Sequence, residues 1–179
     1  MKACFMGLGY IGLPTAIIAA EHGIEVIGVD INPQVVDMTN QGLIHIVEPG
    51  LQELCRKVVM SGHLKASVKP ETSDVYLVVV PTPFKGNHEP DISYVETATR
   101  SVIPLLKEND LFIIESTSPV GTTDKMTDLI FSLRPELKGK IYIAYCPERV
   151  LPGNTLYELV HNDRVIGGIN PESTEKAIE

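Results

Sequence analysis

The sequence predicts an α/β fold with a doubly wound, mainly parallel sheet. Apolar runs that suit buried strands alternate with helix-forming stretches along most of the 179 residues. The first run, Ala3–Met6, leads into Gly7-Leu8-Gly9-Tyr10-Ile11-Gly12, and a helix-forming stretch follows. The second run, Glu25–Val29, ends in Asp30, 18 residues after Gly12. A glycine-rich segment between strand and helix, with an acid closing the next strand, predicts a Rossmann-type domain that binds NAD.

Each residue of the glycine-rich segment has an expected part in holding the cofactor. Gly7 permits the tight turn out of the strand. Gly9 lacks a Cβ atom, so the main chain can approach a pyrophosphate closely, and Gly12 lets the helix pack against the sheet. The free N–H groups at the start of the helix favour the phosphates. We therefore expect Gly7, Gly9, Tyr10, Ile11 and Gly12 to contact the cofactor.

Asp30 is expected to make the site prefer NAD over NADP. Its carboxylate can accept hydrogen bonds from the adenosine ribose, and its charge would repel the 2′-phosphate of NADP. No arginine or lysine follows Asp30 before Arg56, so no neighbouring cation of that kind favours the phosphate. The alternative is that the glycines form a turn in another kind of α/β protein and that Asp30 merely ends a strand.

Composition excludes several other classes of function. The net charge is −8, and no cluster of basic residues suits nucleic acid or an anionic membrane. No apolar run has the ~20 residues that a membrane helix needs, and the first strand begins too early for a signal peptide. Three cysteines without C-x-x-C spacing and five scattered histidines predict neither a disulfide framework nor a metal site. A reducing cytoplasm is the expected location.

The elements follow in order along the first half of the chain. Helices are expected at 11–22, from Pro33 to Asn40, and at 49–60, where Pro33 suits a first helical position. Strands are expected at 2–6, 26–30, 64–68 and 75–80. The last of these is continuously apolar, as is typical of a central parallel strand.

The second half of the chain continues the alternation. We expect a polar loop over 84–90, a helix from the N-cap Asp91 to Lys107 that Pro104 kinks or ends early, and a strand at 111–115. A helix from Gly121 to about Leu133, a strand at 141–145, a loop at 146–154 and a last strand at 164–166 complete the domain, which we place at 1–168. Asn170 and Pro171 open another helix. Since that helix has no C-cap signal, we expect residues 169–179 to be the start of a linking helix in a truncated chain.

Ligands of a doubly wound sheet bind beyond the carboxyl ends of its strands, where this sequence places unusual turns. Pro81 and Pro83 stiffen the backbone around Thr82. This stiff turn either presents Thr82 to the cofactor or serves only to make the loop rigid. Thr117 and Ser118 offer hydroxyl groups that either reach the cofactor site or cap the next helix. Thr123 follows within that helix. We expect Thr82, Thr117 and Thr123 to contact the cofactor.

The loop after the strand at 141–145 carries the residues best suited to act on a substrate. The Glu148 carboxylate can orient water or bind substrate, and Arg149 can pair with a phosphate or carboxylate. The alternative is that these charged residues only join neighbouring loops by a salt bridge. Cys146 has no nearby histidine to activate it and reads as a small buried residue rather than a nucleophile.

These residues together resemble the UDP-glucose/GDP-mannose dehydrogenase family from residue 1 to about 179. The resemblance rests on Gly7–Gly12, Asp30, Glu48-Pro49-Gly50-Leu51, Pro81-Thr82-Pro83, Ser116-Thr117, Pro119-Val120-Gly121 and Pro147-Glu148. Three longer strings, at 81–91, 115–121 and 145–153, are most similar to the branch that acts on UDP-N-acetyl-D-mannosamine.

The resemblance implies a four-electron oxidation of a sugar 6-hydroxyl to a carboxylate, with NAD+ consumed in two successive steps. A family cysteine forms a thiohemiacetal and then a thioester, but its position lies beyond this chain. Thr117 matches a threonine near the catalytic water and Glu148 a glutamate near the sugar. Many UDP-glucose enzymes carry a second acid where this chain has Pro152, and this difference argues against UDP-glucose as the substrate. Arg149 and Val150 are then candidate substrate contacts.

The resemblance also sets the expected partners and the alternatives. The expected substrate is UDP-N-acetyl-D-mannosamine, oxidised to the uronate for polysaccharide synthesis, with UDP-N-acetylglucosamine or UDP-glucose as alternatives. The full-length enzyme is expected to be a homodimer or larger, and this chain by itself to be inactive. A non-catalytic NAD-sensing module is the alternative from another class.

Overall fold

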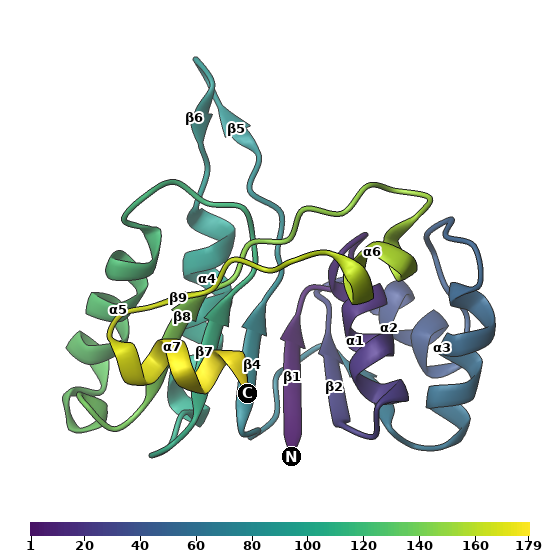
Figure 1. Cartoon of the computed structure of the whole chain (residues 1–179), viewed down its shortest axis with the longest axis horizontal. Coiled ribbons are helices and arrows are strands. Elements are labelled where there is room, and N and C mark those ends of the chain that lie inside the picture. Colours follow the sequence, from purple (N-terminus) through teal and green to yellow (C-terminus); the bar gives the residue numbers. More distant parts are fainter.

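The structure, a computed structural model, describes residues 1–179, and its centre is one seven-stranded sheet with the order β3-β2-β1-β4-β7-β8-β9 (Figure 1). The first six of these strands are parallel, and β9 runs antiparallel to β8. This confirms the predicted doubly wound sheet. The strands are β1 (Lys2–Met6), β2 (Glu25–Val29), β3 (Leu64–Ser67), β4 (Val75–Val78), β7 (Leu111–Ile114), β8 (Tyr142–Tyr145) and β9 (Gly167–Gly168).

Helices cover both faces of the sheet. They are α1 (Gly12–Glu21), α2 (Pro33–Asn40), α3 (Leu51–Met60), α4 (Ser93–Val102), α5 (Thr122–Leu133), α6 (Thr155–His161) and α7 (Pro171–Ile178). Short 3₁₀ turns follow α4 and α5 at Ile103–Leu105 and Pro135–Leu137. None of the helices combines the length and apolarity that crossing a lipid bilayer requires.

Alternate residues of each strand build the two cores. Phe5 packs with α1 and α3, whereas its neighbour Cys4 packs in the core beneath α4 and α5. Likewise Phe112 faces α4 and α5, and Ile113 faces the side that α7 covers. Because the side chains of a strand point alternately to opposite faces, a strand that is buried on both faces is apolar along its length, as β7 is, with all four of its residues buried.

The strand order reverses between β1 and β4, which start opposite halves of the sheet. Gly7 follows β1 at this point with φ +110°, and a Cβ atom there would lie 2.4 Å from the Val79 carbonyl oxygen. A Cβ atom on Gly12 would lie 2.0 Å from the Gly7 carbonyl oxygen. The turn and the start of α1 are therefore packed so closely that only glycine fits at either position.

Two predicted helix starts are confirmed by their caps. The Asn32 side chain accepts a hydrogen bond from the Gln34 N–H, and Pro33 opens α2. The Asn170 side chain accepts one from the Ser173 N–H, and Pro171 opens α7. Both satisfy an N–H group that has no partner within its helix.

The segment predicted as a polar loop at 84–90 contains a short hairpin instead. Strands β5 (Phe84–Lys85) and β6 (Glu89–Pro90) pair antiparallel and project beyond the body of the molecule (Figure 1). Gly86 and His88 have positive φ angles, which turn the chain between the strands. An ion pair of 2.8 Å between Lys85 and Asp91 ties the hairpin to its base. Two-residue strands are too short to leave an alternating pattern in the sequence.

The helix predicted from Asp91 to Lys107 is shorter than expected. It runs from Ser93 to Val102, and Ile92 rather than Asp91 is the N-cap residue, although the Asp91 carboxylate does accept the Ser93 N–H at 2.9 Å. The 3₁₀ turn around Pro104 ends the helix, as the ring of proline requires.

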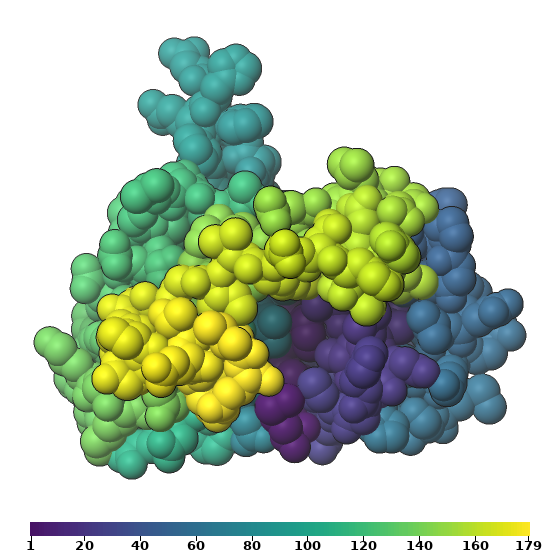
Figure 2. All heavy atoms as spheres, in the orientation of Figure 1, coloured from purple at the N-terminus to yellow at the C-terminus, as the bar shows by residue number.

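The last part of the sheet also differs from the prediction. The final strand is Gly167–Gly168 rather than 164–166, and the predicted loop after β8 is followed by helix α6, which had not been expected. The residues from the end of β8 to β9 cross over the carboxyl ends of the strands as a continuous band (Figure 2). Arg164 belongs to this band, where its side chain pairs with Glu115 and Glu148, and it takes no part in strand pairing.

Candidate active site

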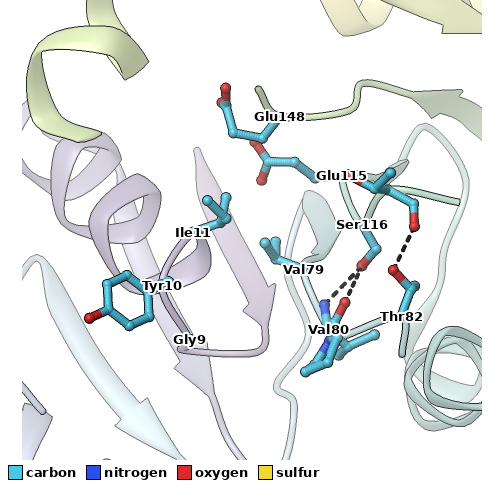
Figure 3. A pocket seen from close by; sticks show the side chains of 11 residues that line it. Gly9, Tyr10, Ile11, Val79, Val80, Thr82, Glu115, Ser116 and Glu148 are labelled. Carbon is cyan, nitrogen blue, oxygen red and sulfur yellow. Dashed lines mark hydrogen bonds between the residues drawn. The ribbon is translucent and has the colours of Figure 1, made fainter. Parts of the chain in front are cut away.

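A cleft of about 230 Å³ lies at the carboxyl ends of the central strands. Four segments that follow β1, β4, β7 and β8 line it: 9–11, 79–82, 115–117 and Glu148. These segments are far apart in the sequence and meet because the strands are parallel and adjacent (Figure 3). The position at a reversal of strand order is where doubly wound sheets bind ligands.

The glycine-rich turn supplies one wall of the cleft. Space for a Cβ atom on Gly9 is open, with no heavy atom within 4 Å, in contrast to Gly7 and Gly12. Tyr10 and Ile11 also line the cleft, and the Tyr10 ring points away from the acidic side chains opposite (Figure 3). An open glycine beside the first turn of α1 leaves room for a group to contact the main chain directly.

Asp30 lies beside this turn and is held rigidly. Its Oδ2 atom accepts the Leu8 N–H at 3.1 Å, and its Oδ1 atom accepts the Asn32 N–H at 2.9 Å. The carboxylate is therefore fixed between the glycine-rich turn and the start of α2. Each oxygen keeps a further lone pair for a ligand.

The stiff turn after β4 is joined to the turn after β7 by two hydroxyl groups. The Thr82 hydroxyl donates to the Thr117 carbonyl at 2.7 Å. The buried Ser116 hydroxyl accepts the Val80 N–H at 2.9 Å and donates to the Val80 carbonyl at 2.8 Å (Figure 3). The floor of the cleft is thus a fixed surface. Thr82 takes part in it and also faces the cleft.

The predicted threonines do not all reach the cleft. Thr117 lines it, with an exposed side chain. Thr123 lies within α5, outside the residues that line the cleft, where its carbonyl accepts the Thr127 hydroxyl. Neither Thr117 nor Ser118 caps α5, because Gly121 in a left-handed conformation is the N-cap residue. The role of Thr123 stays a prediction.

Two buried carboxylates that line the cleft, Glu115 and Glu148, pair with the partly exposed side chain of Arg164. Arg164 Nη1 lies 2.7 Å from Glu115 Oε1, and Arg164 Nη2 pairs with Glu148 Oε2. The side chains of Glu115 and Glu148 are only 1% and 7% exposed. Burial raises the pKa of Glu115 above the ordinary carboxyl range, and the Arg164 guanidinium offsets part of that rise.

The other residues predicted beside Glu148 point elsewhere. The Arg149 guanidinium donates to the Asp163 carbonyl at 2.8 Å, and the Arg149 N–H donates to Glu148 Oε1 at 2.7 Å. Neither Arg149 nor Val150 lines the cleft. The salt bridge considered for this loop does exist, but it joins Glu148 to Arg164 and not to Arg149.

Cys146 is buried beside Arg164. Its thiol lies 3.8 Å from Arg164 Nη1, and burial raises its pKa above the usual value. A buried thiol with a raised pKa is a poor nucleophile, in agreement with the prediction from the sequence. All three cysteines are free and buried.

Glu48 holds the band that carries Glu148. It is 6% exposed and lies 107 residues before its partner Thr155 in the sequence. Its Oε1 atom accepts the Thr155 N–H at 2.7 Å, and its Oε2 atom accepts the Gly153 N–H at 2.9 Å and the Thr155 hydroxyl at 3.0 Å. It thus satisfies the N–H groups at the start of α6 from across the molecule.

We expect Glu48→Gln to lower the free energy of unfolding by about 2 kcal/mol, because its amide group would face donors and leave one of them buried without a partner. Hydrogen exchange at the Gly153 and Thr155 amides should become faster. Denaturant unfolding and exchange measured by NMR would check this. Glu53→Gln, an exposed acid on the first turn of α3, is the matched control. Unchanged protection of both amides would contradict the proposed anchoring.

Glu115, Arg164 and Glu48 have no role that is expected from the sequence, although Glu48 is part of the string that carries the family resemblance. For Glu115 a signal was present, since an acid directly after the apolar run Leu111–Ile114 ends a buried strand at the edge where ligands bind. No local pattern reveals Arg164 or Glu48, because their partners are distant in sequence.

Comparison with known proteins identifies relatives along the whole chain. The model of the UDP-glucose/GDP-mannose dehydrogenase family, NAD binding domain, matches residues 1–179. The UDP-N-acetyl-D-mannosamine dehydrogenase of Campylobacter jejuni is 52% identical over 99% of this chain and 46% of that protein. The NDP-N-acetyl-D-galactosaminuronic acid dehydrogenase of Ralstonia nicotianae is also 52% identical, over 96% of this chain and 43% of that protein.

A solved structure agrees with these matches. The UDP-N-acetyl-mannosamine dehydrogenase of Staphylococcus aureus superimposes with a TM-score of 0.94 and 47% identity, over 99% of this chain and 44% of that one. The chain therefore spans less than half the length of the relatives it matches.

Proposed function

Because the chain belongs to the UDP-glucose/GDP-mannose dehydrogenase family and matches its NAD-binding domain, we propose that NAD binds along the cleft with its pyrophosphate on the turn at Gly9. The observation that carries this proposal is the open space at Gly9 beside the first turn of α1, between two glycines that are packed tightly. Main-chain N–H groups at a helix start suit a diphosphate, and Tyr10, Ile11 and Gly12 continue that surface.

Asp30 is proposed to hold the adenosine ribose. Its two hydrogen bonds to Leu8 and Asn32 fix the carboxylate next to the pyrophosphate site. With lone pairs left for the ribose hydroxyls and a charge that repels a 2′-phosphate, the site suits NAD rather than NADP.

At the other end of the cleft we propose that Thr117 and Glu148 serve the reaction. NAD supplies a hydride acceptor when bound. The exposed Thr117 hydroxyl is free to hold a water molecule, since only its carbonyl is engaged, by Thr82. Glu148 is oriented by Arg164 and by the Arg149 N–H, so its carboxylate can bind a substrate hydroxyl or direct that water. Arg149 and Val150 remain candidate substrate contacts.

For the whole protein we propose oxidation of UDP-N-acetyl-D-mannosamine to the corresponding uronate, in the synthesis of a polysaccharide. The names of the Campylobacter and Staphylococcus relatives support this substrate. An equally similar relative bears the name of a galactosaminuronic acid dehydrogenase, so another N-acetylhexosamine is the second candidate. The whole enzyme is proposed to be a cytoplasmic homodimer or larger assembly, and the three unpaired cysteines suit that compartment.

Two measurements test the proposal. Calorimetric titration of this chain with NAD and NADP should show binding of NAD and at least about tenfold weaker binding of NADP, because of the Asp30 charge. The full-length protein should reduce NAD+ with UDP-N-acetyl-D-mannosamine faster than with UDP-N-acetylglucosamine, UDP-N-acetylgalactosamine or UDP-glucose. A preference for NADP would refute the assigned cofactor, and a preference for another sugar would refute only the assigned substrate.

A further inference from the structure

One oxygen of Glu115 has no partner in the protein although it is buried. Glu115 is 3% exposed and lines the cleft, and its Oε1 atom is engaged by Arg164 at 2.7 Å. Its Oε2 atom is inaccessible to bulk solvent and makes no hydrogen bond. A buried carboxylate oxygen left without a donor carries a large desolvation cost, so its position beside a cleft points to a donor on the ligand.

The order of strands indicates which part of the cofactor reaches this atom. The proposed adenosine site follows β2 and the pyrophosphate site follows β1, while Glu115 follows β7, two strands farther along the sheet. A dinucleotide that crosses the reversal between β1 and β4 therefore brings its nicotinamide half toward Glu115. The nicotinamide ring has a single group that donates hydrogen bonds, its carboxamide NH₂.

We propose that Glu115 Oε2 accepts a hydrogen bond from the nicotinamide carboxamide and that Arg164 positions Glu115 for this contact. The inference rests on the proposed function, since it requires NAD in the cleft. Arg164 grips both Glu115 and Glu148, and the two acids lie next to each other across from Ile11 (Figure 3). One guanidinium thus fixes both the cofactor contact and the proposed substrate contact.

The substitution Glu115→Gln tests whether the Oε2 atom acts as a hydrogen-bond acceptor for the cofactor, because it replaces that acceptor by a donor. Arginine has only donors, so the oxygen of the introduced amide must face Arg164 and its NH₂ group must take the place of Oε2. A donor would then meet the carboxamide NH₂ of NAD. The analogue 3-acetylpyridine adenine dinucleotide has a carbonyl group and no NH₂, and would accept a bond from the introduced amide. Both oxidised dinucleotides carry the same ring charge, so a purely electrostatic effect of Glu115 cancels between them.

The experiment is calorimetric titration of this chain and of Glu115→Gln with NAD, the acetylpyridine analogue and ADP-ribose. In the parent chain the analogue should bind about ten- to a hundredfold more weakly than NAD, the usual worth of a hydrogen bond to a charged group. Glu115→Gln should abolish or reverse this preference and leave ADP-ribose affinity unchanged. Glu108→Gln is the matched control, since this exposed acid precedes the opposite end of β7.

Each other outcome is decisive. Equal affinity of the parent chain for NAD and the analogue overturns the inference, even if Glu115→Gln fails to fold. The inference is also overturned if Glu115→Gln changes the affinity for NAD and for the analogue by the same factor. Loss of a water molecule bound to Glu115 would have that effect. If the parent chain binds ADP-ribose but shows no such preference, only the inference fails. If it binds neither NAD nor ADP-ribose, the proposed function fails as well.

Discussion

Gly9→Ala is expected to abolish most NAD binding without destabilising the chain, whereas Gly12→Ala is expected to destabilise it strongly. A methyl group on Gly9 meets no heavy atom within 4 Å and would project into the space proposed for the pyrophosphate. We expect NAD affinity to fall by on the order of a hundredfold. On Gly12 the same group would lie 2.0 Å from the Gly7 carbonyl oxygen, at a cost of about 3 kcal/mol or more.

Thermal unfolding and NAD titration of both variants would check this pair of results. Gly167→Ala is the control for stability, because Gly167 also has open space for a methyl group but lies in β9 away from the cleft. If Gly9→Ala binds NAD as tightly as the parent chain, the pyrophosphate does not contact the main chain at this turn. If Gly12→Ala is as stable as the parent chain, the close packing of α1 on the turn is not what requires glycine there.

Asp30→Asn should weaken NAD binding by about ten- to a hundredfold and reduce the preference over NADP. The amide removes the charge that opposes a 2′-phosphate and leaves only one acceptor oxygen for the ribose and the two backbone N–H groups of Leu8 and Asn32. Some loss of stability accompanies this, since one of those N–H groups loses its partner.

The measurement is titration with NAD, NADP and NADH of Asp30→Asn beside Asp128→Asn, an exposed acid on α5 that serves as the charge-matched control. Asp30→Ala, in which both acceptors are absent, should bind NAD more weakly still. Equal NAD affinity of Asp30→Ala and the parent chain would contradict the proposal that Asp30 binds the adenosine ribose.

The regular elements were predictable because their signals are local. Apolar runs marked most of the parallel strands, and Pro33 and the pair Asn170-Pro171 marked two helix starts. The hairpin at 84–90 and helix α6 were missed for different reasons. The hairpin strands are two residues long. Helix α6 is only seven residues long and takes its N-terminal hydrogen bonds from Glu48, far away in the sequence.

The candidate site was predictable in part. Gly9, Tyr10, Ile11, Thr82, Thr117 and Glu148 were singled out from the sequence, and all line the cleft. Their positions follow from the rule that ligands bind beyond the carboxyl ends of parallel strands. Arg164 was expected in a strand, and its actual partners Glu115 and Glu148 could be recognised only once β7, β8 and the band between β8 and β9 were placed together.

The sequence by itself determined the six parallel strands, the glycine-rich turn and the acid that follows the second strand, because each depends on neighbouring residues and on a repeating pattern of burial. Only the tertiary structure decided which side chains form ion pairs and hydrogen bonds with one another. Glu48, in the loop before α3, reaches α6, and Arg164 joins Glu115 to Glu148, which follow the adjacent strands β7 and β8. Such contacts depend on atoms within about 3 Å of one another, and no spacing along the chain encodes that distance.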